Sequence, residues 1–351
     1  MIQRDIVVIG ASAGGLEALK TILNALPHDL NAAIFVVLHT ARHSASLLPA
    51  VLGRVSKLPV SHPKDWERFE HGRVYIAPPG NQMLLNDGVL RVLPGPRENL
   101  HCPAVDPLFR SAAMAYGPRV TGVILTGMLD DGTSGLMVVA ANGGETIVED
   151  PHTALFSSMP ASALEHVPNS HVAPLSELSA TLLRVISQPV DPETSITRKA
   201  SFDAPKETRI AELDMAEISK DDDRPGKPSP FACPDCGGVL WEINENNFLR
   251  FRCRVGHAFT ARYLGAEQRQ ALETALWEAL RALEESASLY RRMADRAEAS
   301  KQHLTVSSYL ERAANTESNS RVLREFLVRV NQYEGSEDPA VAGPEVIREY
   351  S

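Results

Sequence analysis

Apolar residues recur along the chain with two alternating periods up to about residue 188. Short runs rich in β-branched residues, typical of buried strands, alternate with stretches whose apolar positions recur at helical spacing. The runs are 6–9, 33–38, 74–77, 120–125 and 145–148, and the helical stretches are 16–26, 46–55, 104–116, 135–142, 160–165 and 175–186. This order predicts an α/β fold with a doubly wound, mostly parallel sheet, which we assign to residues 1–188.

The pattern changes after this domain. Residues 189–230 contain six prolines, ten acidic residues, seven basic residues and one aromatic residue, so we expect a charged linker that buries little of itself. Residues 231–262 hold three of the four cysteines and are predicted to form a small separate module. Because the linker precedes this module, we expect it to be separable from the α/β domain and its chemistry.

The C-terminal part has the pattern of long helices. Residues 263–334 contain no proline and almost no glycine, and apolar residues recur every seven positions from Leu276 to Ala297. A polar break at 300–303 separates two such stretches, which predicts an antiparallel hairpin of two helices. Its apolar faces are expected to form a core, a self-association seam or a contact for a partner helix. Residues 335–351 are predicted to be a disordered tail.

Composition narrows the function classes. The chain of 351 residues has 35 basic and 44 acidic residues, and its formal net charge of −9 argues against a nucleic-acid partner. The longest apolar runs, such as 32–38, are far shorter than the roughly 20 residues of a membrane span, so no membrane insertion is expected. No basic leader precedes the first strand, and clustered cysteines beside a histidine favour metal ligation in a reducing compartment. We therefore predict a cytoplasmic protein without disulfides.

A serine lies in a glycine-rich turn at the end of the first predicted strand. Gly10-Ala11-Ser12-Ala13-Gly14 has the pattern G-x-S-x-G, between an expected strand and an expected helix. Glycines on both sides of a serine permit the sharp strand-to-helix turn that exposes a nucleophilic oxygen. With the next glycine the segment also resembles the G-x-G-x-x-G turn that binds phosphate, so this motif alone leaves both interpretations open.

Two further chemical groups follow other predicted strands. His39 comes directly after the second strand, and Asp130 and Asp131 lie in a glycine-flanked loop after the strand 120–125. Because the carboxyl ends of parallel strands meet at one edge of a sheet, a serine, a base and a carboxylate would meet there. Histidines and loop aspartates at such positions are commonly bystanders and turn formers, but the three signals complement one another. They predict a triad of Ser12, His39 and an aspartate of this loop.

Five sequence blocks together resemble a known family. They lie in order over roughly residues 3–187 and are Gly10 to Gly15, the strand-terminal His39, Val74 to Gly80, Ala104 to Ala113 and Leu125 to Gly132. In these blocks the chain resembles the catalytic domain of the CheB-type chemotaxis methylesterases. The resemblance implies hydrolysis of γ-glutamyl methyl esters on chemoreceptors with release of methanol and, in many members, deamidation of receptor glutamines. It implies no cofactor for catalysis.

The resemblance also implies the roles of individual residues. It places the nucleophile on Ser12, the base on His39, the carboxylate on Asp131 rather than Asp130, and the oxyanion near the backbone of Ala13 and Met128. The chain departs from the family pattern at Ala13, where threonine is frequent, at Thr40-Ala41-Arg42, where Met-Pro is more familiar, and at Gln82, where histidine is frequent. We expect these departures to alter substrate fit rather than the type of reaction.

The best-known members of this family carry a phosphoacceptor receiver domain ahead of the esterase. Here the strand that leads to the nucleophile begins within ten residues of Met1. We therefore expect a stand-alone form that phosphorylation on a fused receiver does not regulate.

The cysteine cluster has metal-ligand spacing. Cys233 and Cys236 form C-x2-C, Cys253 follows after sixteen residues, and His257 follows after three more. Glycines next to both pairs supply tight turns, and expected strands at 239–243 and 249–252 complete a ribbon. The pattern predicts one structural zinc ion, because four protein ligands leave no open position for catalysis. The remaining thiol, Cys102, is expected to be structural.

Two other functions remain open from the sequence. A nucleotide-binding protein would use the glycine-rich turn for phosphate, but an acidic residue would then be expected where His39 ends the second strand. A signalling scaffold would hold partners through the ribbon and the hairpin around a vestigial esterase domain. The complete set of Ser12, His39 and Asp131 argues against the scaffold.

Overall fold

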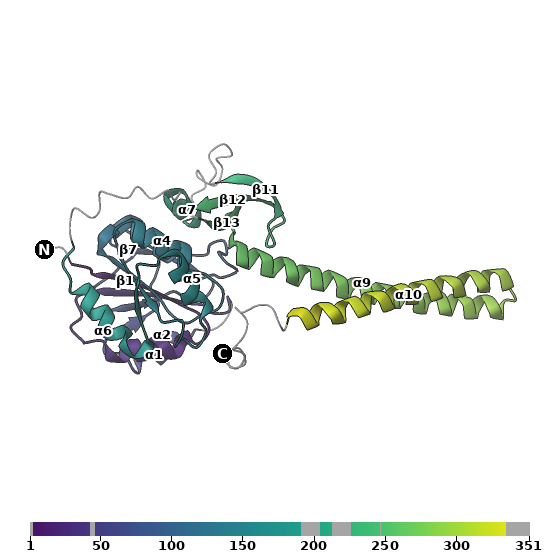
Figure 1. Cartoon of the computed structure of the whole chain (residues 1–351), viewed down its shortest axis with the longest axis horizontal. Coiled ribbons are helices and arrows are strands. Elements are labelled where there is room, and N and C mark those ends of the chain that lie inside the picture. Colours follow the sequence, from purple (N-terminus) through teal and green to yellow (C-terminus); the bar gives the residue numbers. More distant parts are fainter. Residues whose placement is uncertain (1–2, 43–45, 191–203, 213–225, 246, 335–351) are drawn as a thin grey trace. The chain divides into compact units, whose positions relative to one another are not determined.

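The computed structural model describes residues 3–42, 46–190, 204–212, 226–245 and 247–334 (Figure 1). Its described residues fall into two compact units, divided between Leu264 and Gly265. The tail predicted at 335–351 and most of the linker predicted at 189–230 lie outside the described residues. No helix in the described ranges has an apolar stretch long enough to cross a membrane.

The first unit is built on a seven-stranded parallel sheet in the order β10-β9-β8-β1-β2-β5-β3. The strands are β1 (Ile6–Ala11), β2 (Ala33–Leu38), β3 (Val60–Ser61), β5 (Val74–Ile76), β8 (Val120–Ile124), β9 (Glu145–Glu149) and β10 (His171–Ala173). Every residue of β1, β2 and β8 is buried, as expected for parallel strands with both faces covered. The predicted fold class is confirmed.

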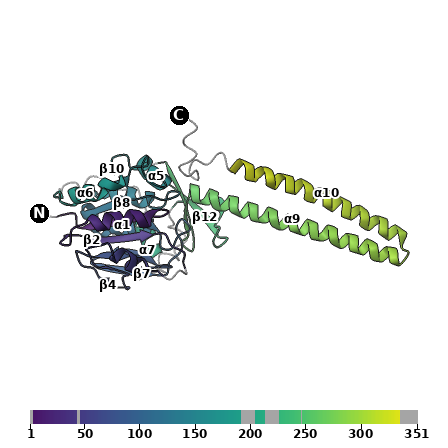
Figure 2. The same ribbon diagram turned by 90° about the horizontal axis from the view of Figure 1, so that it is seen from below.

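Helices cover both faces of this sheet (Figures 1 and 2). Alternate residues of β1 point to opposite sides, so Val7 and Ile9 join one core and Ile6 and Val8 the other. The first core includes α1 (Gly15–Ala25), α2 (Leu48–Gly53) and α6 (Leu175–Ile186). The second includes α3 (Val105–Tyr116), α4 (Thr133–Ala141) and α5 (Ser158–His166).

The strand order of the sheet reverses at its centre, at β1. β1 pairs with β2 on one side and with β8 on the other, so the turns after these three strands lie side by side. Gly14, at φ 75°, caps α1 in the left-handed region, which glycine adopts without strain. Gly10 lies so close to α3 that a Cβ there would be 2.4 Å from Val105 Cγ1. Gly14 thus allows the sharp turn from β1 into α1, and Gly10 allows β1 to pass close to the start of α3.

Two antiparallel sheets complete the first unit. One has the order β4-β7-β6 and is formed by β4 (Glu67–Arg68), β7 (Val89–Leu93) and β6 (Gln82–Asn86). The other has the order β11-β12-β13-β14, formed by β11 (Lys227–Ala232), β12 (Val239–Glu245), β13 (Phe248–Cys253) and β14 (Ala258–Thr260). We call this four-stranded sheet with its cysteine turns, residues 227–260, the ribbon. It belongs to the same compact unit as the parallel sheet.

The range expected to be a linker contains a buried helix. α7 (Ala204–Ala211) packs near α3, and the side chain of Glu207 within it is 1% exposed. The expectation that this stretch buries little is wrong for residues 204–211. Its Glu207 faces arginines of α3 and β13 instead of water.

The second unit contains the two predicted C-terminal helices, α9 (Ala261–Ala299), whose first turn belongs to the first unit, and α10 (His303–Glu334). The break between them falls where the sequence places it. Arg291 pairs with Glu317 at 2.6 Å and Arg324 pairs with Glu284, so residues later in α10 meet residues earlier in α9. The helices are therefore antiparallel.

Candidate active site

Ser12, His39 and Asp131 meet at the carboxyl edge of the parallel sheet. Ser12 follows β1, His39 follows β2, and Asp131 lies in the loop between β8 and α4. His39 Nδ1 is 3.0 Å from Ser12 Oγ, and His39 Nε2 is 2.7 Å from Asp131 Oδ2. The arrangement resembles the nucleophile, base and carboxylate chain of the serine-protease template, with the two ring nitrogens of the histidine exchanged.

Asp131 is buried and its carboxylate is fully used. Besides His39, Oδ2 accepts a hydrogen bond from the Val105 N–H at 2.7 Å, and Oδ1 accepts one from Asn99 Nδ2 at 2.9 Å. Burial alone would raise the pKa of Asp131, but the hydrogen bond from His39, supported by the one from the Val105 N–H, holds it below its usual value. Asp131 is therefore ionised at neutral pH and can orient His39 and stabilise its protonated form.

The neighbouring Asp130 has a different environment. Its Oδ1 accepts a hydrogen bond from Thr260 Oγ1 at 2.7 Å, and among the described residues the ring of His39 bonds Ser12 and Asp131, not Asp130. Burial raises the pKa of Asp130 to about 6, against the lowering effect of the Thr260 hydrogen bond. The two aspartates thus differ in partner and in the direction in which the protein shifts their pKa.

Asp130→Asn is expected to stabilise the protein at alkaline pH and to leave ester hydrolysis nearly unchanged. The folded-state pKa of about 6 exceeds the ordinary 3.8, so wild-type stability falls as pH rises between these values, and the whole loss is present above pH 6. Asparagine carries no charge and avoids this loss, which is roughly 3 kcal/mol at most. Urea unfolding of both proteins at pH 4.5 and pH 8 measures it. An equal effect of the substitution at both pH values would contradict the assignment.

His101 is a site residue that the sequence interpretation passed over. Its ring stacks on His39 with the centroids 3.5 Å apart and the planes at 11°, and its Nε2 lies 3.2 Å from Tyr263 Oη. Burial of the ring lowers the pKa of His101 to about 3, and the nearby His39 is the second cause of this shift. The ring of His101 is therefore neutral. The adjacent Cys102 is buried with its Sγ 3.9 Å from the Gly95 carbonyl oxygen. In the sequence His101 stood out only as the neighbour of that thiol.

Backbone donors lie beside the serine. The N–H groups of Ser12, Gly127 and Leu129 are used in hydrogen bonds to Thr126, Phe156 and Ser158. Within the part of the chain that the structure describes, the N–H groups of Ala13 and Met128 donate to no protein acceptor. These are the two groups that the resemblance assigns to the oxyanion.

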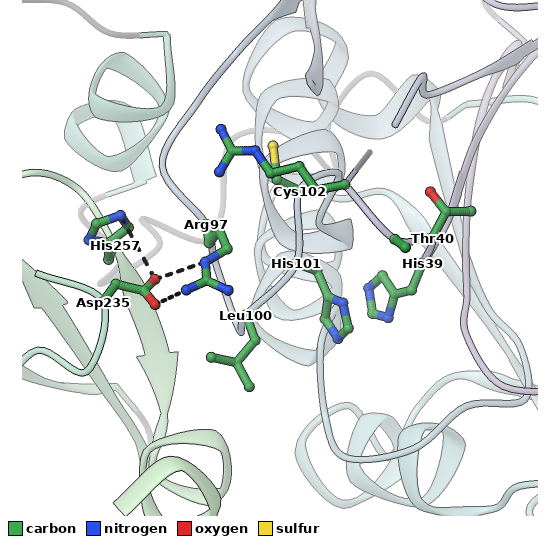
Figure 3. A pocket seen from close by; sticks show the side chains of 10 residues that line it. His39, Thr40, Arg97, Leu100, His101, Cys102, Asp235 and His257 are labelled. Atoms are coloured by element: carbon green, nitrogen blue, oxygen red, sulfur yellow. Dashed lines mark hydrogen bonds and ion pairs between the residues drawn. The ribbon is translucent and has the colours of Figure 1, made fainter. Parts of the chain in front are cut away.

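A cavity of about 700 Å³ opens beside His39 (Figure 3). Its lining comes from the turn after β2, the loop before α3 and the ribbon: His39, Thr40, Ala41, Arg42, Arg97, Leu100, His101, Cys102, Asp235 and His257. The departure at Thr40 to Arg42 therefore does lie at the cavity. Gln82 does not line it, because its buried amide bonds the Pro96 carbonyl and the Ala104 N–H, so the expected effect of Gln82 on substrate fit is not supported.

The four predicted metal ligands also come together. The ligand atoms of Cys233, Cys236, Cys253 and His257 all lie within 4.8 Å of one another. Cys236 Sγ and Cys253 Sγ are 3.7 Å apart, and His257 Nδ1 is 3.6 Å from Cys253 Sγ. A tetrahedral ion with Zn–S bonds of about 2.3 Å separates its sulfur ligands by about 3.8 Å. The residues present therefore fit a metal of this kind.

Comparison with known proteins gives a consistent picture. A model of the CheB methylesterase family matches residues 7–182. The chain is 40% identical over 178 residues to protein-glutamate methylesterase/protein-glutamine glutaminase 2 of Anaeromyxobacter dehalogenans, covering 51% of this chain and 52% of that one. It is 35% identical over 182 residues to a Leptospira interrogans protein whose name gives the same two activities provisionally, covering 52% of this chain and 94% of the relative.

A solved structure is similar to the same part of the chain. The crystal structure of the Thermotoga maritima CheB methylesterase catalytic domain shares 34% sequence identity with it, over 52% of this chain and 98% of that chain, with a TM-score of 0.49. The chain spans about half the length of several relatives that it matches.

Proposed function

The chain belongs to the CheB methylesterase family, and from this premise we propose that it is a serine hydrolase that demethylates γ-glutamyl methyl esters of chemoreceptors, releasing methanol. The observation that carries the proposal is the hydrogen-bonded chain from Ser12 through His39 to Asp131. The relatives named for both demethylation and deamidation support the substrate class.

The reaction follows from this geometry. His39 Nδ1 takes the proton of Ser12 Oγ as the oxygen attacks the ester carbonyl carbon, and Asp131 stabilises the protonated ring. The N–H groups of Ala13 and Met128 stabilise the oxyanion of the tetrahedral intermediate. His39 then gives its proton to the departing methoxy oxygen, which leaves as methanol and produces an acyl-enzyme on the receptor glutamyl group. Water, deprotonated by His39, releases the free glutamate and restores Ser12.

Deamidation is a second activity of the same site. A glutamine side chain presents the same carbonyl carbon, and ammonia takes the place of methanol as the leaving group. The names of the relatives favour this activity, and nothing in the site geometry distinguishes the two leaving groups.

Methanol release from methylated receptor membranes tests the function. Wild-type protein is expected to release methanol, and Ser12→Ala protein is expected to release none above the uncatalysed rate. Parallel measurement of ammonia with glutamine-bearing receptors tests deamidation. Wild-type protein that releases neither product would contradict the proposed function and would favour the vestigial-esterase scaffold.

We also propose that Cys233, Cys236, Cys253 and His257 bind one structural zinc ion per chain. Three thiolates and an imidazole are soft ligands in the number of a closed tetrahedral site. The zinc ion would hold together the two turns of the ribbon that carry these cysteines and His257, and it would take part in no step of the reaction. The cytoplasmic location and a partner helix for residues 263–334 stay predictions.

Cys236→Ser is expected to lose the zinc and the order of the ribbon. The ribbon's own apolar cluster is small, and metal binding contributes on the order of 10 kcal/mol in comparable zinc peptides. Metal content per purified chain and hydrogen exchange of residues 227–260 measure the two losses. Cys102→Ser, which changes the one cysteine outside the cluster, is the matched control and should keep one zinc. Full zinc occupancy in Cys236→Ser would refute the ligand assignment.

A further inference from the structure

The ribbon packs against the esterase loop through buried charges. Glu98, in the loop before α3, lies 2.9 Å from Arg110 of α3 and 3.0 Å from Arg252 of β13. Glu207 of α7 completes the cluster with Arg252 at 2.8 Å and Arg250 at 2.9 Å. All five side chains are at most 6% exposed. A module attached only by a linker would not bury five charges at its contact with the esterase.

A chain of hydrogen bonds runs from this interface to the triad. Thr260 of β14 donates its N–H to Asn99 Oδ1 at 2.9 Å, and Asn99 Nδ2 donates to Asp131 Oδ1 at 2.9 Å. The Asn99 N–H also donates to the Ala258 carbonyl at 2.8 Å, so β14 holds both the backbone and the side chain of Asn99. Asn99 itself has a φ of 50° and is buried. β14 thus fixes the group that holds the carboxylate opposite His39.

A second contact leads from the end of the ribbon to the base. Tyr263 follows β14 by three residues, and its Oη lies 3.2 Å from Nε2 of His101, whose ring stacks on His39. Both ends of the His39–Asp131 pair are therefore supported by residues that follow the ligand His257 closely in the chain.

The candidate metal site also contacts the loop before α3. His257 directly precedes β14, and its carbonyl accepts the N–H of Cys253 at 2.9 Å. Asp235, between Cys233 and Cys236, pairs with Arg97, whose Nε is 3.2 Å from Asp235 Oδ2 (Figure 3). The metal turns and β14 thus both contact the stretch from Arg97 to His101.

We propose that the metal-bound ribbon is part of the catalytic unit and that Asn99 is the positioning residue through which β14 holds Asp131 against His39. The inference rests on the proposed function and deepens it, because it makes the metal site a requirement for turnover. It reverses the expectation that the ribbon module is separable from the esterase chemistry. Asn99 touches neither substrate nor serine and acts through Asp131.

The first test is Asn99→Ala in the full chain. Displacement of a catalytic group by about 1 Å costs on the order of 100-fold in rate, so we expect kcat to fall 10- to 100-fold while KM changes less than threefold. Asn142→Ala, the same exchange at an asparagine that bonds only within α4, should leave both constants unchanged. Tyr263→Phe should lower kcat three- to tenfold. Zinc content should stay at one per chain in all three variants. Unchanged kcat in Asn99→Ala would overturn the proposal.

The second test is a double-mutant cycle between Asn99→Ala and Cys236→Ser. The readout is the rate at which a fluorophosphonate labels Ser12, which reports the activated serine without a receptor substrate. If the ribbon acts through Asn99, the double variant should label no more than about threefold more slowly than the slower single variant. Independent effects, whose fold-losses multiply, would overturn the proposal, as would full labelling in Cys236→Ser protein that lacks zinc.

Two further outcomes separate this inference from the proposed function. Wild-type protein whose Ser12 is not labelled would overturn the triad itself. If Cys236→Ser fails to fold, removal of the metal from wild-type protein by a chelator takes its place in the cycle. Labelling that stays at the full rate in metal-free protein would then overturn the proposal. Labelling that falls on metal removal, and is restored by zinc in wild type but not in Asn99→Ala, would support it.

Discussion

Ser12→Ala is expected to lower ester hydrolysis by roughly 10⁴- to 10⁶-fold, because the members of a serine triad act as a unit and the remaining hydrogen-bond donors account only for the residual rate. Ser12 Oγ is the group 3.0 Å from the base, and no other hydroxyl bonds His39 among the residues that the structure describes. The loss is measured as kcat/KM on a methylated receptor and, independently of the receptor, on a small activated ester.

His39→Ala should match Ser12→Ala, whereas Asp131→Asn should cost less, since an amide oxygen in the place of Oδ2 can still accept from Val105 and His39. Ser187→Ala, the same exchange at an exposed serine after α6, is the control and should be fully active. Circular dichroism of each variant should match wild type. A Ser12→Ala protein that keeps more than a tenth of the activity would contradict the assignment of the nucleophile.

Glu207→Gln is expected to destabilise the first unit by about 3–5 kcal/mol. Burial alone would raise the pKa of Glu207, but Arg250, Arg252 and Arg110 hold it well below its ordinary 4.5, so the carboxylate is charged in the folded protein. Removing that charge leaves three buried arginines with only two carboxylates, Glu98 and Glu245, so one buried positive charge is no longer compensated. Such a loss is far more costly than losing a surface pair. The free energy of unfolding in urea at pH 7 measures the effect.

The stabilisation that Glu207 provides decreases as the pH falls. Because the folded-state pKa of Glu207 lies below the unfolded value, its contribution is fully present at neutral pH and is lost as pH falls below about 4.5. The difference between wild type and Glu207→Gln should therefore shrink in acid. Glu317→Gln, which breaks the exposed pair with Arg291, is the control and should leave the free energy of unfolding nearly unchanged. Equal effects of the two substitutions would show that the buried cluster contributes no more than a surface pair.

The sequence predicts the parallel sheet and the three strand-end groups well, for local reasons. Continuous apolar runs require a sheet covered on both faces, and the parallel topology then brings the ends of β1, β2 and β8 to one edge. The topology therefore predicts that Ser12, His39 and an aspartate of the loop after β8 lie together, and the family resemblance selects Asp131 as that aspartate. The two helices after residue 263 are also predicted by a local pattern, the helical spacing of their apolar residues.

The buried charges could not be predicted in this way. The composition of 189–230 is that of a solvated linker, and a glutamate such as Glu207 looks the same whether it meets water or three arginines. Its partner Arg250 is 43 residues away and Arg252 is 45 residues away, so no local pattern signals the pairing. Asn99 and His101 are similar, because their roles depend on Thr260 and Tyr263, more than 160 residues later. Only the packing of the ribbon reveals them.

The long sequence separation between Asp130 and its partner Thr260, 130 residues, has a consequence during synthesis of the chain. A ribosome that adds about 5–20 residues per second needs roughly 6–26 s to cover that distance. In the later part of this interval all strands of the parallel sheet have been made, but the strand that secures the catalytic loop has not. We expect a nascent chain stalled before β14 to label Ser12 with a fluorophosphonate 10- to 100-fold more slowly than the full chain, so that full activity begins only when the strand after the metal-binding segment has been made.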